Sequence, residues 1–275
     1  MPNPSLNKTL STWSTRSQQL LINLAIVLLS LVGMMLLLFT QPSPGKAAPL
    51  TTAPSAIAPE TVQNLYEERP LHHPDGIGKF YLGREIAQVM GHRGAGWLER
   101  SRRESEEQPQ KLVTSLRLKP TDVVADIGAG TGYLSFRIAP RLPQGKVLAV
   151  DLQPEMVEIL AERQHQTQLA NLEPILGTAT DPQLPANSVD LVLMVDAYHE
   201  FEFPHEMMQA IARSLKPKGR VVLVEYRGED PRVMIKPLHK MTQAQVKKEM
   251  AAIGLQWQNT QNLLPQQHIL TFSKA

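Results

Sequence analysis

Residues 123–133 constrain the fold more than any other stretch of the chain. Their sequence is Val-Val-Ala-Asp-Ile-Gly-Ala-Gly-Thr-Gly-Tyr, so a strand-like apolar run leads through Asp126 into glycines at every second position. Residues 133–138 then show an amphipathic pattern that predicts a helix. Glycines at a strand-to-helix turn let the backbone approach a ligand closely, and the free N–H groups of the helix N-terminus favour an anionic or polar ligand. The stretch therefore predicts a ligand-binding β–α unit.

The chain after this turn alternates between strand and helix patterns. Strand-like runs occupy residues 146–150, 174–176, 189–195 and 221–224, and helical patterns follow the first and the third of them. Alternation of this kind indicates βαβ units and a mostly parallel sheet. The run 189–195 is almost entirely apolar, which is typical of a strand covered on both faces. We therefore expect an α/β fold, completed by strands near 255–257 and 269–272.

The spacing of the glycines separates two kinds of ligand. Dinucleotide-binding strands end in G-x-G-x-x-G, whereas Asp126-x-Gly128-x-Gly130-x-Gly132 is one residue shorter. This pattern resembles the first motif of the class I S-adenosylmethionine-dependent methyltransferases. The resemblance extends over residues 112–272 and includes a turn at 215–220, where Lys218 replaces a glycine of the family pattern. It implies a Rossmann-like α/β fold, with a seven-stranded mostly parallel sheet, helices on both faces and an antiparallel last strand.

The resemblance also implies which residues bind the cofactor, S-adenosylmethionine. In that family the glycine loop wraps the methionine part, the acid before the glycines helps to hold its amino group, and an acid after the third strand accepts from the adenine amino group. Asp151 ends the second strand, and a carboxylate there can accept from both ribose hydroxyls, although the same position serves nicotinamide cofactors. The implied cofactor-binding residues are Asp126, Gly128, Ala129, Gly130, Thr131, Gly132, Asp151, Leu152, Thr180, Asp181 and Val195.

Candidate catalytic residues follow the fourth strand. Asp196 and Tyr198 are expected to face the methyl-bearing end of the cofactor, and His199 is the best candidate for a general base because its ordinary pKa is near neutrality. Glu225 and His239 are further candidates. The segment lacks the Asn/Asp-Pro-Pro-Tyr form used to methylate exocyclic amines of nucleic acids. This absence argues against a nucleic-acid amino methyltransferase. The overall pattern resembles the small-molecule methyltransferases similar to those of quinone biosynthesis, which implies a small-molecule acceptor.

No metal site is predicted. The chain has no cysteine, which excludes thiolate catalysis and cysteine-based metal sites. The pairs His199-Glu200 and His205-Glu206 place their histidines six residues apart, whereas a helical H-E-x-x-H zinc site needs a spacing of four.

The N-terminal segment predicts membrane targeting. Residues 20–39 carry no charge and are long enough as a helix to cross a bilayer, while 45–47 resemble a cleavage site, so an anchor and a cleaved signal both stay open. Lys8 and Arg16 before the run, against Lys46 after it, favour a domain on the non-cytoplasmic side. The predicted regions are a basic terminus (1–19), a single hydrophobic helix as transmembrane or signal segment (20–40), a Pro/Ala/Ser/Thr-rich linker (41–59), a helical cap (60–118) and the methyltransferase core (119–275).

The cap is expected to consist of three helices that cover the cofactor or the substrate. Ile86, Val89 and Met90 predict the first, which would end near Gly91. Residues 97–107 predict a largely solvated second helix and 111–116 a third. Within the cap, the candidates for contact with a ligand are Tyr81, Arg84 and Trp97.

The charge distribution limits the possible partners. Lys8, Arg16 and Lys46 precede the first acidic residue, Glu60. From Glu60 onward the chain has 25 of its 28 basic residues and all 26 acidic ones. The body of the protein is therefore nearly neutral, which does not suit nucleic-acid binding. Two other functions stay open: a scaffold that binds the cofactor but has lost methyl transfer, and a nicotinamide-dependent oxidoreductase, against which the short glycine spacing and Asp181 argue.

Overall fold

The computed structural model describes residues 65–274. The predicted basic terminus, hydrophobic helix and linker lie outside these residues, so membrane targeting stays a prediction. Within residues 65–274, no helix combines the length and the apolar character that a membrane span requires.

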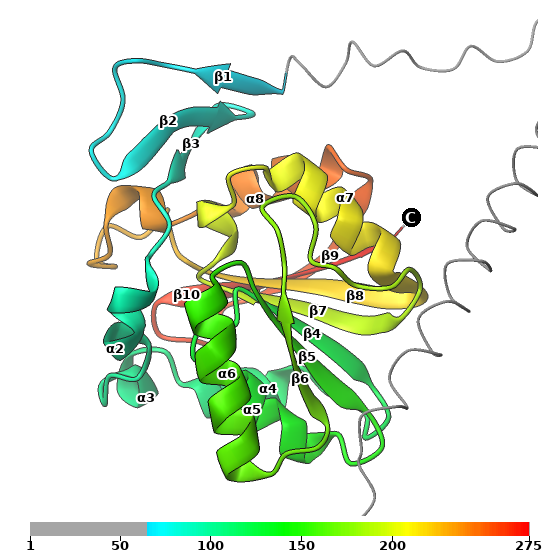
Figure 1. The fold of residues 1–275 in the computed structure, drawn as a ribbon. Coiled ribbons are helices and arrows are strands. Elements are labelled where there is room, and N and C mark those ends of the chain that lie inside the picture. Colours follow the sequence, from blue (N-terminus) through cyan, green and yellow to red (C-terminus); the bar gives the residue numbers. More distant parts are fainter. Residues whose placement is uncertain (1–64, 275) are drawn as a thin grey trace, which may run out of the picture. The chain divides into compact units, whose positions relative to one another are not determined.

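A seven-stranded sheet forms the centre of the described part (Figure 1). Its order is β6-β5-β4-β7-β8-β10-β9, and β10 runs antiparallel to both of its neighbours, whereas the other pairs from β6 to β8 are parallel. The strands are β4 (Val123–Ile127), β5 (Lys146–Asp151), β6 (Leu172–Leu176), β7 (Val189–Val195), β8 (Leu215–Tyr226), β9 (Leu255–Gln261) and β10 (Gln267–Lys274). The predicted sheet and its antiparallel end are confirmed.

One strand is longer than predicted. The turn expected at 215–220 is part of β8, whose pairing with β7 shifts register between Val189 and Leu191. The irregular pairing accommodates Pro217, which has no N–H to donate to a sheet.

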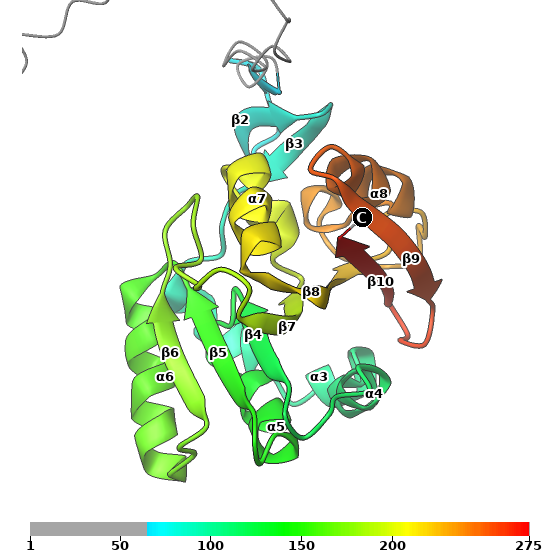
Figure 2. The same cartoon turned by 90° about the vertical axis from the view of Figure 1, so that its right-hand side faces the viewer.

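Helices cover both faces of the sheet, as Figures 1 and 2 show. Apolar residues of α7 (Pro204–Ser214) and α8 (Gln243–Ala251) pack in one core cluster with β4, β5, β7 and β8. Residues of α4 (Pro109–Ser115), α5 (Ser135–Ile138) and α6 (Pro154–Thr167) belong to the second cluster. Three 3-10 helices lie between these elements: η4 (Ala139–Arg141), η5 (Tyr198–Glu200) and η6 (Pro237–His239).

The predicted helical cap is only partly helical. Strands β1 (Tyr66–Glu68), β2 (Gly76–Tyr81) and β3 (Arg84–Ala87) form a small antiparallel sheet, so the prediction of a helix through Ile86 to Gly91 is wrong. Leu82 and Gly83 both have positive φ (48° and 91°), as the two central residues of a hairpin turn often do. This turn brings β2 and β3 side by side, so residues 84–87 pair as a strand. The short helices η3 (His92–Gly94), α2 (Ala95–Leu98) and α3 (Arg103–Glu106) follow, and α4 confirms the third predicted helix.

Tyr81 and Arg84 attach the small sheet to the helices above the main sheet. Arg84 donates two hydrogen bonds to the buried Glu249 of α8, at 2.7 and 3.0 Å, and a third to the carbonyl of His199 at 3.0 Å. The hydroxyl of Tyr81 lies 3.3 Å from Nδ1 of His205 in α7. Arg84 therefore helps to position the turn η5, whereas Tyr81 contacts α7, and neither residue lines the cavity described next.

Candidate active site

A cavity of about 480 Å³ lies at the carboxyl ends of the central strands. Its walls come from the glycine loop after β4, the ends of β5, β7 and β8, helices α2 and α3, the turn η5 and the segment 234–239. The volume is in the range of small-molecule sites, and the carboxyl edge is where open α/β sheets bind ligands. Of the three cap residues expected to contact a ligand, Trp97 is the one that lines this cavity.

The glycine loop is shaped by left-handed backbone. Gly128, Gly130 and Gly132 have φ values of 74°, 55° and 81°, which glycine adopts without strain. A Cβ atom at Gly128 would lie 2.7 Å from Cβ of Ala197, and one at Gly130 would lie 2.5 Å from Cδ1 of Leu98. Gly128 and Gly130 line the cavity, so a ligand can approach the backbone of the loop at these two residues without meeting a side chain.

The other loop residues face away from the cavity. Gly132 packs against Leu160 and Phe136, where a Cβ would lie 2.6 Å from either side chain. Ala129 donates its N–H to the carbonyl of Val150 at 3.0 Å. The hydroxyl of Thr131 donates to Glu99 at 2.6 Å. These residues fix the shape of the loop, and their predicted contact with a cofactor stays a prediction.

Asp151 joins the end of β5 to the glycine loop. Its Oδ2 accepts from the N–H of Gly130 and its Oδ1 from the N–H of Gln153, both at 2.9 Å. Burial raises the pKa of the carboxyl group. Asp151 and its neighbour Leu152 line the cavity, and each carboxylate oxygen can still accept a further hydrogen bond. This position fits the predicted contact with two vicinal hydroxyl groups.

Three predicted acidic or hydroxyl side chains are not in the cavity wall. Asp126 is buried and accepts a hydrogen bond from the hydroxyl of Ser135 at 2.6 Å, and burial raises its pKa to about 6. Asp181 accepts from the N–H of Gln183 at 2.7 Å in an exposed turn that also holds Thr180. Neither Asp126, Asp181 nor Thr180 lines the cavity, so their roles toward a cofactor stay predictions.

Asp196 lies in the wall between the glycine loop and the end of β8. Its φ is 50°, a left-handed value that aims the side chain off the end of β7. Oδ2 accepts from Gln267 at 2.6 Å, whereas Oδ1 is shielded from solvent and has no hydrogen-bond partner among residues 65–274. Burial, with the carboxylates of Glu107 and Glu225 nearby, raises the pKa of Asp196 well above its ordinary value. Asp196 is therefore poised to pair with a donor or a positive charge.

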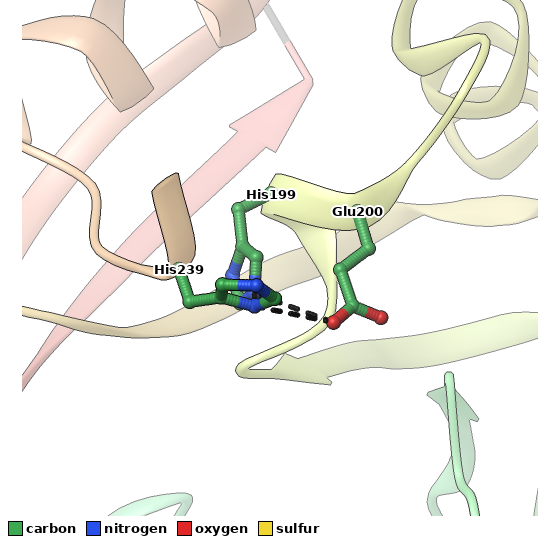
Figure 3. A group of neighbouring side chains, drawn as sticks. All are labelled: His199, Glu200 and His239. Carbon is green, nitrogen blue, oxygen red and sulfur yellow. Dashed lines mark hydrogen bonds and ion pairs between the residues drawn. The ribbon is translucent and has the colours of Figure 1, made fainter. Parts of the chain in front are cut away.

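His199, Glu200 and His239 come together (Figure 3), and all three line the cavity. Nε2 of His199 lies 3.2 Å from Nδ1 of His239, and Oε1 of Glu200 lies 3.4 Å from Nδ1 of His239 and 3.8 Å from Nε2 of His199. Behind them, Oε2 of Glu225 lies 2.7 Å from Nδ1 of His199. The three base candidates, His199, Glu225 and His239, thus form one chain of contacts.

Burial makes the imidazole of His199 a weak base. Its side chain is only 2% exposed, and this burial lowers its pKa to about 3. Burial also raises the pKa of Glu225, because both charged forms lose hydration. General base catalysis works best when the pKa is near the working pH. The ring is therefore a neutral donor–acceptor group at neutral pH, and its predicted role as general base stays untested.

Tyr198 does not reach the cavity, contrary to expectation. It is fully buried, with its ring 5.4 Å from that of Phe201 and 5.6 Å from the guanidinium of Arg84. Successive side chains of the 3-10 turn η5 point in different directions. The turn therefore sends Tyr198 into the core and its two successors into the cavity.

The comparisons with known proteins agree with this architecture. Residues 124–219 match the family model described as a methyltransferase domain. Residues 124–219 therefore carry a methyltransferase domain. It is 31% identical over 146 residues to an uncharacterized methyltransferase-like protein of Schizosaccharomyces pombe, covering 53% of this chain and 54% of that protein. It is also 31% identical over 122 residues to the demethylmenaquinone methyltransferase of Symbiobacterium thermophilum, covering 44% of this chain and 49% of that protein. The match thus spans about half the length of these relatives.

A solved structure shares the fold of the methyltransferase domain. The crystal structure of a SAM-dependent methyltransferase from Aquifex aeolicus aligns with a TM-score of 0.63 at 22% identity, covering 67% of this chain and 98% of that chain. The antiparallel β10 between β8 and β9 also differs from the strand order 3-2-1-4-5-6 of dinucleotide-binding sheets. The predicted family is confirmed, and with it S-adenosylmethionine as the cofactor that the family uses.

The cavity of the methyltransferase domain fits this cofactor. Gly128 and Gly130 provide a wall that side chains would fill, Asp151 offers oxygens for hydroxyl groups, and Oδ1 of Asp196 offers an unpaired acceptor for an ammonium group. Two basic side chains, Arg100 and Arg103, add positive charge to the same wall.

These arginines were not expected at the site from the sequence. Arg103 and Glu107 are buried, and Nε of Arg103 donates to Oε2 of Glu107 at 2.7 Å. The hydroxyl of Tyr226, at the end of β8, donates to Oε1 of Glu107 at 2.8 Å. Dense charge at 99–107 suggested a solvated helix, and only the four-residue spacing of Arg103 and Glu107 hinted at pairing. Glu200 was likewise noted only for its place after His199.

Proposed function

We propose that the protein transfers the methyl group of S-adenosylmethionine to a small molecule that enters the same cavity. One observation carries the proposal: the glycine loop, Asp151 and the cluster of His199, Glu200 and His239 all line one cavity. The residues proposed to bind the cofactor and the side chains able to bind or deprotonate an acceptor therefore line the same cavity. An acceptor that enters this cavity can therefore meet the methyl group of the bound cofactor.

The residues of the chain hold the reactants in line. When bound, S-adenosylmethionine supplies an electrophilic methyl group, and the electron pair of its breaking C–S bond remains on sulfur while the acceptor atom bonds the carbon. Asp151 binds the ribose, and Asp196 accepts from the amino group. The acceptor loses one proton to solvent or to the partly exposed His239. Positioning supplies much of the rate for a reaction with so good a leaving group.

The cavity favours an apolar or aromatic acceptor. Its walls include Val89, Met90, Met156, Phe201, Met234 and Ile235. A hydrophobic small molecule fits such walls better than a polyanion does, and the near-neutral body of the chain offers no basic surface for nucleic acid. The similarity to a demethylmenaquinone methyltransferase supports a quinone-like acceptor.

Membrane targeting is part of the proposal. The uncharged residues 20–39, with more basic charge before them than after them, favour a membrane-bound protein with its domain on the non-cytoplasmic side. Protease treatment of sealed vesicles carrying the full-length chain tests this: protection or digestion of the domain reports its side. Recovery of the chain in the soluble fraction alone, at full length, would contradict targeting.

The activity is tested by acceptor-dependent formation of S-adenosylhomocysteine. Full-length protein is incubated with S-adenosylmethionine and a panel of quinols, catechols and phenols. We expect at least one acceptor to stimulate turnover, and Asp151→Ala to abolish it. Asp190→Asn is the matched control. Asp190 lies near the amino end of β7, away from the carboxyl ends of the strands that form the cavity, and it accepts a hydrogen bond from the N–H of Val123 at 2.8 Å. Tight cofactor binding with no turnover across the panel would instead support a scaffold that has lost methyl transfer.

A further inference from the structure

The cluster of His199, Glu200 and His239 has the dimensions of a metal site. Its three facing atoms are Nε2 of His199, Nδ1 of His239 and Oε1 of Glu200, separated by 3.2, 3.4 and 3.8 Å. Tetrahedral ligands bound at about 2.0–2.2 Å are separated by about 3.3–3.6 Å. An ion placed between the three atoms therefore needs only small side-chain movements to reach bonding distance to all of them.

Each ligand atom is oriented by a neighbour. Oε2 of Glu225 lies 2.7 Å from Nδ1 of His199, a contact that fits the tautomer with its proton on Nδ1 and the lone pair of Nε2 facing the cluster. The other oxygen of Glu225 accepts from the N–H of Tyr198 at 3.1 Å. Oε2 of Glu200 accepts from the N–H of Met90 at 3.2 Å, which leaves Oε1 for the cluster. A carboxylate behind a ligating histidine is the usual support of protein metal sites.

We propose that His199, Glu200 and His239 bind a divalent transition-metal ion in the cavity of the methyltransferase domain. Two imidazoles and one carboxylate suit zinc, iron, cobalt or nickel, whereas magnesium and calcium prefer ligands that are all oxygen. The three side chains line the cavity, so at least one coordination position faces the bound reactants. This proposal departs from the sequence expectation of no metal, which rested on the absence of cysteine and on the H-E-x-x-H spacing along a helix.

The competing arrangement is a hydrogen-bonded chain without metal. In it, Nδ1–H of His239 donates to Nε2 of His199 or to Oε1 of Glu200, and the chain ends at Glu225. Both arrangements need the same four side chains. They differ in whether the cluster takes up a metal ion stoichiometrically, which makes metal binding the decisive observation.

The open position also defines an acceptor class. This acceptor class, unlike the metal site itself, rests on the proposed methyl transfer. An acceptor hydroxyl group would bind the ion through its oxygen atom, and the bound ion would lower the pKa of that hydroxyl group. Acceptors with two adjacent oxygens, such as catechols and quinols, suit such a position.

Metal titration of untagged full-length protein tests the site. We expect one equivalent of Zn²⁺ or Co²⁺ per chain, removable by a chelator, and the visible absorption of four- or five-coordinate Co²⁺. His239→Ala and Glu200→Gln should each lower the affinity at least tenfold, and Glu225→Gln, which removes the support of His199, about 10–100-fold. His165→Ala is the matched control, since this exposed histidine in α6 lies outside the cluster, and it should leave the affinity unchanged.

Two outcomes would overturn the metal site. One is the absence of stoichiometric Zn²⁺ or Co²⁺ binding by the folded wild-type protein. The other is an affinity that stays the same in folded His239→Ala, a change at a partly exposed residue that the fold should tolerate. Binding of S-adenosylmethionine to chelator-treated protein is measured in parallel. Loss of the metal site with retained cofactor binding would leave the proposed methyltransferase function standing.

Discussion

The carboxylate of Asp151 accepts a hydrogen bond from the backbone N–H of Gly130 at 2.9 Å. This contact joins the end of β5 to the loop after β4, so one side chain both fixes the glycine loop and forms part of the cavity wall. The loop and the acid are separated by 21 residues in sequence, and the parallel pairing of β4 with β5 brings them together. The N–H groups of Gly128 and Ala129, which donate to the carbonyl of Val150 at 2.9 and 3.0 Å, hold the same loop against β5.

Gly130→Ala should abolish cofactor binding at a moderate cost in stability. An alanine in the left-handed region costs about 1–2 kcal/mol, and its Cβ would also press on Leu98 at the cavity wall. Gly254→Ala is the matched control, because Gly254 has a φ of 81° with nothing within 4 Å of an added Cβ. We expect similar losses of unfolding free energy by urea titration, but lost S-adenosylmethionine binding only for Gly130→Ala. Equal cofactor affinity in the two variants would refute the role of the loop.

Asp126→Asn should flatten the pH dependence of stability. Burial raises the pKa of Asp126 to about 6, above the unfolded value near 3.9, so the folded state holds this proton more tightly. The resulting stabilisation is present below about pH 4 and is lost as the pH rises through 6, a change of about 3 kcal/mol. Urea unfolding of both proteins at several pH values between 4 and 7 measures the difference. Parallel stability curves would show that the carboxyl of Asp126 titrates normally in the folded protein.

Arg84→Met should destabilise the fold strongly. It leaves the fully buried Glu249 without its bidentate partner, and breaking a buried pair from one side costs about 3–5 kcal/mol. The double variant Arg84→Met with Glu249→Met removes both charges and should recover much of the loss. Arg232→Met, in an exposed pair with Asp230, should have no measurable effect on unfolding. If Arg84→Met and Arg232→Met unfold alike, the small sheet is not held by this pair.

Local patterns were sufficient for the central sheet. The glycine spacing, the apolar run 189–195 and the alternation of strands and helices each depend on residues close in sequence, and these elements formed where predicted. The β2–β3 hairpin was missed because the left-handed Leu82-Gly83 turn carries no Asn-Gly or Asp-Gly signal. Side-chain direction was the other failure. The rotation of η5 buries Tyr198, which was expected to face the cofactor.

The site itself required the tertiary structure. His199, Glu225 and His239 were each singled out in the sequence, but they come from η5, β8 and η6, and only the fold brings them within hydrogen-bonding distance. Glu200 completes the cluster because the same turn presents adjacent side chains to one cavity. The buried network of Arg103 and Glu107 was hidden within a run of charges that suggested solvent exposure.

Calorimetric titration of the full-length chain with S-adenosylmethionine and with NAD tests the central claim most directly. We predict saturable binding of S-adenosylmethionine and none of NAD. Asp151→Ala should weaken the binding at least tenfold, because it removes both the ribose acceptor and the anchor of Gly130, while Asp190→Asn should match the wild-type protein. Binding of NAD, or S-adenosylmethionine binding that is unchanged in folded Asp151→Ala, would contradict the account.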